Sequence, residues 1–329
     1  MEASWPAVDD EVMAMVQAGA TIVVVALMAI LQAAHTSRKQ EVAFLSPLSH
    51  TREGKMRMVA HRGSSHTAPE NTLASLSLAF RQGACGVEFD IQKSSDGELF
   101  LLHDDTLRRT ASPGCPCTLE GLSQEEYEVM LDQDISQLSY RDFIRHVDVG
   151  TWKQAEYAGE RPCLMTDAMA TLPAGCFALC EVKGGDKATA QAVTTLAKEK
   201  GWTGDQLTFI GFDLELMTEI KQRLLELDMG AIAVIYVQDA YDEEKAMEVI
   251  RLAKAAGLDG VDFEADLSVV TPAVVSLAAA VGMQTGVWVW PSQLPKSDTH
   301  PTAAELDRCG VNFFTTDLPP AMQDWICAY

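Results

Sequence analysis

The sequence predicts an α/β protein: a (β/α)8 TIM barrel with a small insertion after the second strand, preceded by an N-terminal transmembrane helix. Two observations predict the barrel. Eight short runs rich in β-branched and aromatic residues alternate with helical patterns after residue 56. Glycines follow several of those helical patterns, as expected at helix C-termini. Such alternation favours a closed parallel sheet, and an open doubly wound sheet is the alternative. No G-x-G-x-x-G motif follows the first strand, so dinucleotide binding has little support.

The N-terminal region divides into a tail (1–11), an anchor (12–34) and a linker (35–56). No charged residue occurs from Val12 to Ala34, which is enough chain to cross a bilayer as a helix. Acidic residues precede this segment, whereas Arg38 and Lys39 follow it, which favours a single-pass protein with the bulk of the chain on the cytoplasmic side. A signal peptide and a core helix are the alternatives.

Residues 57–329 form the predicted barrel. The expected strands are Arg57–Gly63, Cys85–Ile91, Phe177–Lys183, Leu207–Asp213, Ala231–Val237, Gly260–Ala265, Gln284–Pro291 and Asn312–Leu318. The clearest helical patterns are Glu70–Gln82, Lys187–Lys200, Leu214–Leu227, Glu243–Ala256 and Thr271–Val281. Thr67 and Glu70 have the spacing of a capping box for the first of these helices, so we assign them no chemistry.

One interval is much longer than a crossover needs. Between Ile91 and Phe177 we expect an extra strand (Glu98–His103), a Pro/Cys turn and a helix near Ser123–Leu131. Long excursions from a barrel are commonly functional.

Charge and cysteine content limit the partners. The chain has 47 acidic and 25 basic residues, a formal net charge of −22, so nucleic acid is not an expected partner. An anionic substrate would need local positive charge from a metal or a few bases. The eight cysteines contain no C-x-x-C pair, and we expect reduced, mostly buried thiols.

Carboxylates gather where strands of a barrel place their reactive groups. Glu88 and Asp90 are two residues apart on one strand, so both point into the barrel, and Glu181 joins them from the next strand. Unpaired, these groups would repel one another strongly. A divalent cation would relieve the repulsion, and oxygen ligands favour Mg²⁺ or Ca²⁺. The alternative is a structural network in which the carboxylates pair with Arg62 and Lys183.

Two histidines also lie at strand ends. His61 and His103 have ordinary pKa values near 6.5, so one can be charged while the other is neutral, as a general acid and a general base require. Trp288 and Trp290 lie on one face of a later strand and could form an apolar wall for a substrate, or pack in the core.

With these residues the chain resembles the glycerophosphodiester phosphodiesterase family. The matching blocks, in order and spacing, are His61-Arg-Gly, Pro69-Glu-Asn-Thr72, Gly86-Val-Glu88-Phe-Asp90, His103-Asp104, Glu181-Val-Lys183, Gly211-Phe-Asp213 and Gly310 to Asp317. The resemblance implies a metal-dependent hydrolase of glycerophosphodiesters, with His61 and His103 as the acid/base pair and Glu88, Asp90 and Glu181 as metal ligands. It also implies that Arg62 and Lys183 hold the phosphate.

Some positions depart from the family pattern. The seventh strand reads Val287-Trp-Val-Trp-Pro291 where the family commonly has Trp-Thr-Val-Asn. This bears on the substrate's head group rather than on the reaction. Three functions therefore stay open: hydrolysis of soluble glycerophosphodiesters, lysophospholipase D-type hydrolysis of membrane lysophospholipids, and a membrane-attached module that binds phospholipid without turnover.

Overall fold

The computed structural model describes residues 56–114, 119–184, 187–289 and 299–320. The chain divides into two compact units, Met1–Leu45 and Ser46–Tyr329, and all described residues belong to the second. The predicted tail, anchor and linker up to residue 55 lie outside the described residues. Within the described part of the chain, every helix is too short or too polar to span a bilayer.

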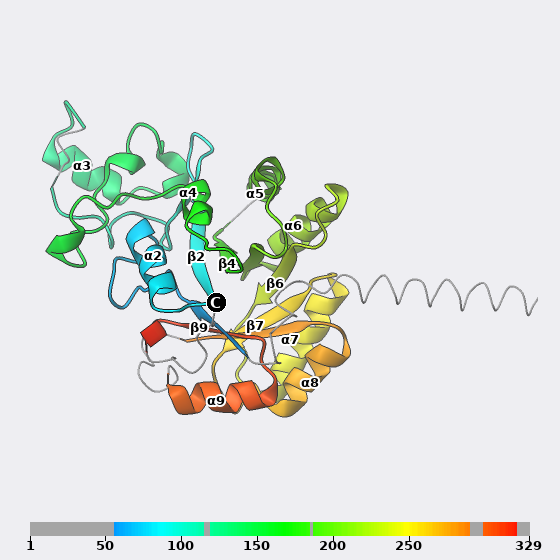
Figure 1. Cartoon of the computed structure of the whole chain (residues 1–329). Helices are drawn as coiled ribbons and strands as arrows, with labels where there is room; N and C mark the ends of the chain where they lie inside the picture. Colours follow the sequence, from blue (N-terminus) through cyan, green and yellow to red (C-terminus); the bar gives the residue numbers. More distant parts are fainter. Residues whose placement is uncertain (1–55, 115–118, 185–186, 290–298, 321–329) are drawn as a thin grey trace, which may run out of the picture. The chain divides into compact units, whose positions relative to one another are not determined.

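Eight parallel strands close into a barrel, which confirms that part of the predicted fold class (Figure 1). The hydrogen-bonded order is β1-β9-β8-β7-β6-β5-β4-β2, and β1 pairs with β2 to complete the ring. The barrel strands are β1 (Arg57–Ala60), β2 (Gly86–Lys93), β4 (Phe177–Val182), β5 (Leu207–Gly211), β6 (Ala233–Val237), β7 (Gly260–Glu264), β8 (Gln284–Trp288) and β9 (Phe313–Thr316).

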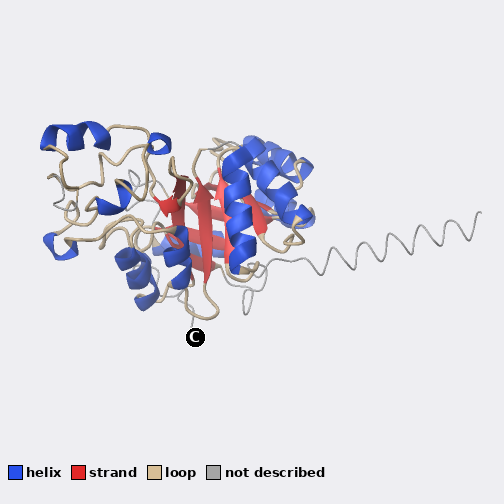
Figure 2. Cartoon of the chain, turned by 90° about the horizontal axis from the view of Figure 1, so that it is seen from above, coloured by secondary structure: helices blue, strands red, loops and turns tan. Residues whose placement is uncertain are grey.

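Helices surround the strands, as Figure 2 shows. Except for the helix Gln124–Leu131 in the insertion, the described α-helices turn an apolar face to the outside of the sheet. The buried side chains between these two layers form the largest hydrophobic cluster of the described residues. The α-helices are α2 (Leu73–Arg81), α3 (Gln124–Leu131), α4 (Met165–Ala170), α5 (Lys187–Lys200), α6 (Leu214–Glu226), α7 (Glu243–Ala255), α8 (Pro272–Ala280) and α9 (His300–Cys309).

A smaller cluster fills the inside of the barrel below the site. Val59, Leu179, Ile235 and Phe313 belong to it, each from a different strand. Gly286 makes room for one of these rings, since a Cβ there would lie 2.0 Å from the Phe313 ring. The bottom of the barrel is therefore packed solid, and the functional groups are confined to its upper end.

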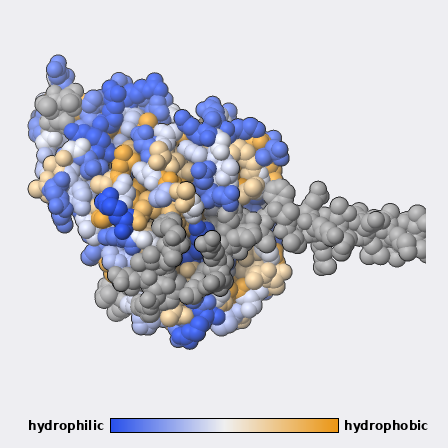
Figure 3. Space-filling model, viewed as in Figure 1, coloured by the Kyte–Doolittle hydropathy of each residue, from blue (hydrophilic) through white to orange (hydrophobic). Residues whose placement is uncertain are grey.

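The insertion after β2 begins with β3 (Leu99–Leu101), which pairs antiparallel with β2. It continues through α3, the helix expected near Ser123–Leu131, which Ser123 caps, and through three 3-10 turns, Ile135–Gln137, Ile144–His146 and Ala155–Tyr157. The insertion has a hydrophobic core of its own, which includes Leu107, Tyr127 and Phe143. Figure 3 shows hydrophilic side chains over much of its surface, consistent with the acidic composition.

Two sequence expectations were wrong. Helix α2 begins at Leu73 rather than at residue 70, and its capping box is Thr72 with Ser75, not Thr67 with Glu70. The expectation of reduced cysteines fails at Cys85, which is disulfide-bonded. It holds at Cys163, Cys176 and Cys180, which are buried free thiols.

Candidate active site

A cavity of about 710 Å³ opens at the carboxyl ends of the strands. It brings together most of the predicted site residues: His61, Arg62, Glu88, His103, Glu181, Lys183 and Trp288. Asp90 is fully buried behind this wall and joins the site through its carboxylate. Trp290 lies outside the described residues.

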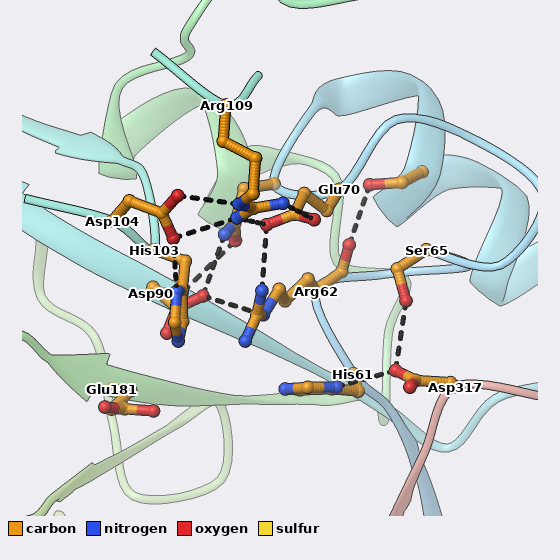
Figure 4. Close-up of polar contacts among 12 residues, drawn as sticks. His61, Arg62, Ser65, Glu70, Asp90, His103, Asp104, Arg109, Glu181 and Asp317 are labelled. Atoms are coloured by element: carbon orange, nitrogen blue, oxygen red, sulfur yellow. Dashed lines mark hydrogen bonds and ion pairs between the residues drawn. The ribbon is translucent and has the colours of Figure 1, made fainter. Parts of the chain in front are cut away.

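The turn after β1 sets the direction of both the backbone N–H and the side chain of Arg62. Arg62 has φ 53° and Gly63 φ 76°, so the chain passes through the left-handed region twice in succession. A Cβ at Gly63 would also lie 2.5 Å from the backbone carbon of Ser75. This tight turn points the Arg62 backbone N–H at Glu88 Oε2 (2.9 Å) and lets the Arg62 side chain reach Glu70 (Figure 4).

The three predicted metal ligands lie together. Glu88, Asp90 and Glu181 each offer a carboxylate oxygen within 4.8 Å of the others, and all three are buried. The strand register produces this cluster, since Asp90 on β2 pairs with Glu181 on β4. Asn71, itself at φ 57°, holds Asp90 by donating from Nδ2 to Asp90 Oδ2 (2.8 Å).

The bases only partly neutralise this cluster. Lys183 Nζ lies 2.6 Å from Glu181 Oε1 and 3.2 Å from Asp90 Oδ1, and Arg62 Nε lies 3.3 Å from Asp90 Oδ2. The structural network considered as an alternative is therefore present in part. Glu88 Oε1, however, is buried without a hydrogen-bond partner.

The pKa values of the three carboxyl groups indicate that the nearby bases do not fully compensate the negative charge of the cluster. Burial and the charge of Asp90 raise the pKa of Glu88 to about 8 and that of Glu181 to about 7. Burial also opposes the charge on Asp90, but Arg62 and Lys183 outweigh it and hold the pKa of that carboxyl well below its usual range. Buried oxygen donors with one lacking a partner fit a hard divalent cation.

Each histidine has its ring fixed by a carboxylate. His61 Nδ1 lies 2.6 Å from Asp317 Oδ1, and His103 Nδ1 lies 2.7 Å from Asp104 Oδ1 (Figure 4). Because an ionised carboxylate can only accept, Nδ1 of each neutral ring carries the proton and Nε2 is the atom left for chemistry.

The two histidines are shifted in opposite directions. Burial and Arg62 oppose the charge on His61, but the hydrogen bond to Asp317 and the charge of Glu88 outweigh them and raise its pKa. Burial, Arg62 and Lys183 lower the pKa of His103 despite the favourable charge of Asp90. This split suits an acid and a base in one cavity.

Three charged cavity residues were missed in the sequence. Glu70, which we had assigned no chemistry, accepts from Arg62 Nη1 (2.8 Å), and Arg109 contacts both Glu70 and Asp104. Asp262 on β7 is 1% exposed, and its Oδ1 has no hydrogen-bond partner. Asp262 could have been found, since its strand was predicted and few strand interiors carry an acid. The partners of Glu70 and Arg109 depend on long-range packing.

A closed parallel barrel with two carboxylate-fixed histidines, two half-buried bases and a carboxylate cluster at the strand ends defines a barrel enzyme. Residues 61–320 match the model of the glycerophosphoryl diester phosphodiesterase family. The chain belongs to this family, which confirms the predicted resemblance.

Individual relatives agree with this assignment. Human glycerophosphodiester phosphodiesterase 1 is 58% identical over 52 residues, which is 16% of each chain. The rat protein of the same name is 51% identical over 65 residues, 19% of this chain and 20% of the relative. These matches thus span about a fifth or less of the curated relatives.

Solved structures match over a much larger part of the chain. A phosphodiesterase from Oleispira antarctica, solved in complex with the product sn-glycerol-3-phosphate, aligns with a TM-score of 0.64 at 26% identity, covering 83% of this chain and 98% of that one. A glycerophosphodiester phosphodiesterase from Agrobacterium tumefaciens aligns with a TM-score of 0.63 at 20% identity, covering 82% and 99%.

Proposed function

We propose that this chain hydrolyses glycerophosphodiesters to glycerol phosphate and an alcohol, with Mg²⁺ or Ca²⁺ held by Glu88, Asp90 and Glu181. The supporting observation is the single cavity in which this carboxylate cluster faces Arg62, Lys183 and both histidines. Family membership and the glycerol phosphate bound to the Oleispira antarctica relative point to the same substrate class.

The bases of the site can hold the phosphodiester. Arg62 and Lys183 each keep donors that their carboxylate partners do not occupy, because a guanidinium has five N–H groups and an ammonium three. These donors bind the non-bridging oxygens and stabilise the charge that develops on them. A bound divalent cation would add Lewis-acid stabilisation of the same oxygens.

The histidines move the protons through their Nε2 atoms. A raised pKa favours the protonated form of His61, so this ring is available to protonate the leaving alcohol oxygen. A lowered pKa favours the neutral form of His103, so this ring is available to take the proton of the nucleophile, either water or the neighbouring glycerol hydroxyl.

The apolar side of the cavity supports a second candidate, lysophospholipase D-type hydrolysis. Ile210, Phe212, Val237 and Trp288 line the wall opposite the charged groups. The rings of Phe212 and Trp288 meet edge to face with their centroids 6.1 Å apart. Such a wall suits an acyl chain or an apolar leaving group.

One assay separates the candidates. The purified full chain is incubated with Mg²⁺ or Ca²⁺ and either glycerophosphocholine or micellar lysophosphatidylcholine, and released choline is measured. Choline from the first substrate alone supports the main proposal, and choline from the second supports the lipid activity. No product from either contradicts both and leaves the non-catalytic binding module. EDTA should abolish turnover and either cation should restore it; full activity in EDTA would contradict the metal assignment.

The membrane anchor over residues 12–34 and its orientation stay predictions. Protease protection of the barrel in sealed vesicles tests the orientation. Digestion from the cytoplasmic side only would uphold the predicted orientation, and protection from that side would reverse it.

A further inference from the structure

Arg109 lies in the insertion, eight residues after β3, yet its side chain lines the catalytic cavity. The backbone on both sides of it is fixed. Leu107 is fully buried in the core of the insertion, and Thr110 is 4% exposed. The insertion therefore presents this guanidinium from an anchored segment rather than from a free loop.

The guanidinium of Arg109 binds two carboxylates at once (Figure 4). It forms a bidentate pair with Glu70, with Nη1 to Oε2 at 2.8 Å and Nη2 to Oε1 at 2.7 Å. It forms a second pair with Asp104, with Nε to Oδ2 at 2.6 Å and Nη2 to Oδ1 at 3.0 Å. All three nitrogens of the planar fork are used.

Each of these carboxylates also contacts one of the predicted site residues. Asp104 Oδ1 fixes His103 through Nδ1, and Glu70 Oε1 accepts from Arg62 Nη1. A continuous chain of charge-assisted contacts thus runs from His103 through Asp104, Arg109 and Glu70 to Arg62. Two arginines balance two carboxylates within it.

The contacts that connect His103 with Arg62 would change without Arg109. Glu70 would then act on Arg62 alone, in competition with a phosphate oxygen. Asp104 would lose the partner that fixes its plane and so would lose its hold on the His103 ring. Both effects displace groups that must meet the phosphodiester in one geometry.

From these contacts we propose that Arg109 is a positioning residue, through which the insertion sets the relative placement of the base His103 and the phosphate-binding Arg62. The proposal rests on the function proposed above. It gives the insertion a role in catalysis that its sequence does not show.

The experiment compares Arg109→Ala with Arg108→Ala in the full chain. Arg108 is a matched control: it is adjacent and similarly exposed, and it is ion-paired with Glu128 and Asp132 outside the cavity. We expect kcat to fall about 100-fold for Arg109→Ala, the scale of a misplacement near 1 Å, and to stay unchanged for Arg108→Ala. Thermal melting should be similar for the two variants.

Two further variants separate geometry from charge. Arg109→Lys should recover little activity, because one ammonium group cannot form bidentate contacts with both Glu70 and Asp104. Guanidinium added to Arg109→Ala should restore part of kcat. Asp104→Asn combined with Arg109→Ala should lose little more than Arg109→Ala alone, because Arg109→Ala already removes the partner through which Asp104 holds His103. Full activity in Arg109→Lys, or additive losses in the double variant, would overturn the proposal.

A proton NMR measurement tests the positioning role without requiring turnover. The imidazole Nδ1 proton of His103, assigned by its absence in His103→Ala, should shift or broaden in Arg109→Ala, while that of His61 stays in place. An unchanged His103 signal would overturn the positioning role even if the wild-type chain hydrolysed neither substrate.

Discussion

The two halves of the cavity wall differ in chemistry and in how they are held. The half formed by β1, β2 and β4 carries His61, Arg62, Glu88, Glu181 and Lys183, which are tied together by hydrogen bonds and ion pairs. The half formed by β5, β6 and β8 is largely apolar and is held by packing. One half can therefore hold charge and move protons, whereas the other offers an apolar surface.

The largest effect should come from the histidines of the charged half. His61→Ala or His103→Ala should lower kcat about 1000-fold, since proton transfer by a positioned group contributes on this scale. His66→Ala is the control, because His66 is exposed and does not line the cavity. Circular dichroism should show intact folding in all three variants. Near wild-type turnover in either of the first two would contradict the acid/base assignment.

A smaller effect should appear in the pH profile of Asp317→Asn. The carboxylate of Asp317 helps to raise the pKa of His61, so its removal lowers that pKa. If His61 is the acid, it must be protonated, and the alkaline limb of kcat/KM should move to lower pH. The acidic limb, set by His103, should stay in place. Movement of the acidic limb alone would reverse the two roles.

The apolar half should respond in KM rather than in kcat. Trp288→Ala should raise KM for lysophosphatidylcholine about tenfold, the scale of lost contacts in an apolar pocket, and change kcat little. Trp288→Phe retains a ring for the contact with Phe212 and should lose less. Equal losses with glycerophosphocholine would place Trp288 beside the shared part of the substrate instead.

The charged half could be predicted from sequence because its residues follow from strand position. Alternation puts Glu88 and Asp90 on one face of β2, and parallel pairing brings Glu181 beside them. The barrel itself follows from the same alternation of strands and helices. For Trp288 the sequence left open whether the ring forms a substrate wall or packs in the core, and the ring lines the cavity.

The network around Arg109 could not be predicted in this way. Glu70 fits a local capping pattern with Thr67, and only the folded insertion brings Arg109 within reach, 39 residues further along the chain. Local hydrogen bonding and long-range ion pairing competed for the same carboxylate, and the guanidinium prevailed because it supplies two charge-assisted contacts. Likewise, the Cys85 disulfide has no spacing signature, since pairing depends on proximity in the fold.

Asp262 is the exception that sharpens the comparison, because it places an unpaired acid on the wall near the apolar half. Burial raises its pKa well above the usual value, and the charges of Glu88 and Glu181 add to the shift. A group with a raised folded-state pKa loses its stabilising contribution as the pH rises through that pKa. Asp262→Asn removes the ionisation and should therefore stabilise the metal-free protein by about 1 kcal/mol at pH 8, where burial of the charge costs most.

The gain should disappear near pH 3, where the aspartate is protonated in both the folded and unfolded states. Urea unfolding in EDTA at the two pH values measures the difference, with Glu264→Gln, two residues along the same strand and less buried, as the control. If Asp262→Asn were instead less stable at pH 8, the carboxylate would have a stabilising partner in solution. Asp262 would then belong with the charged half of the cavity, and the boundary between the two halves would lie beyond β7.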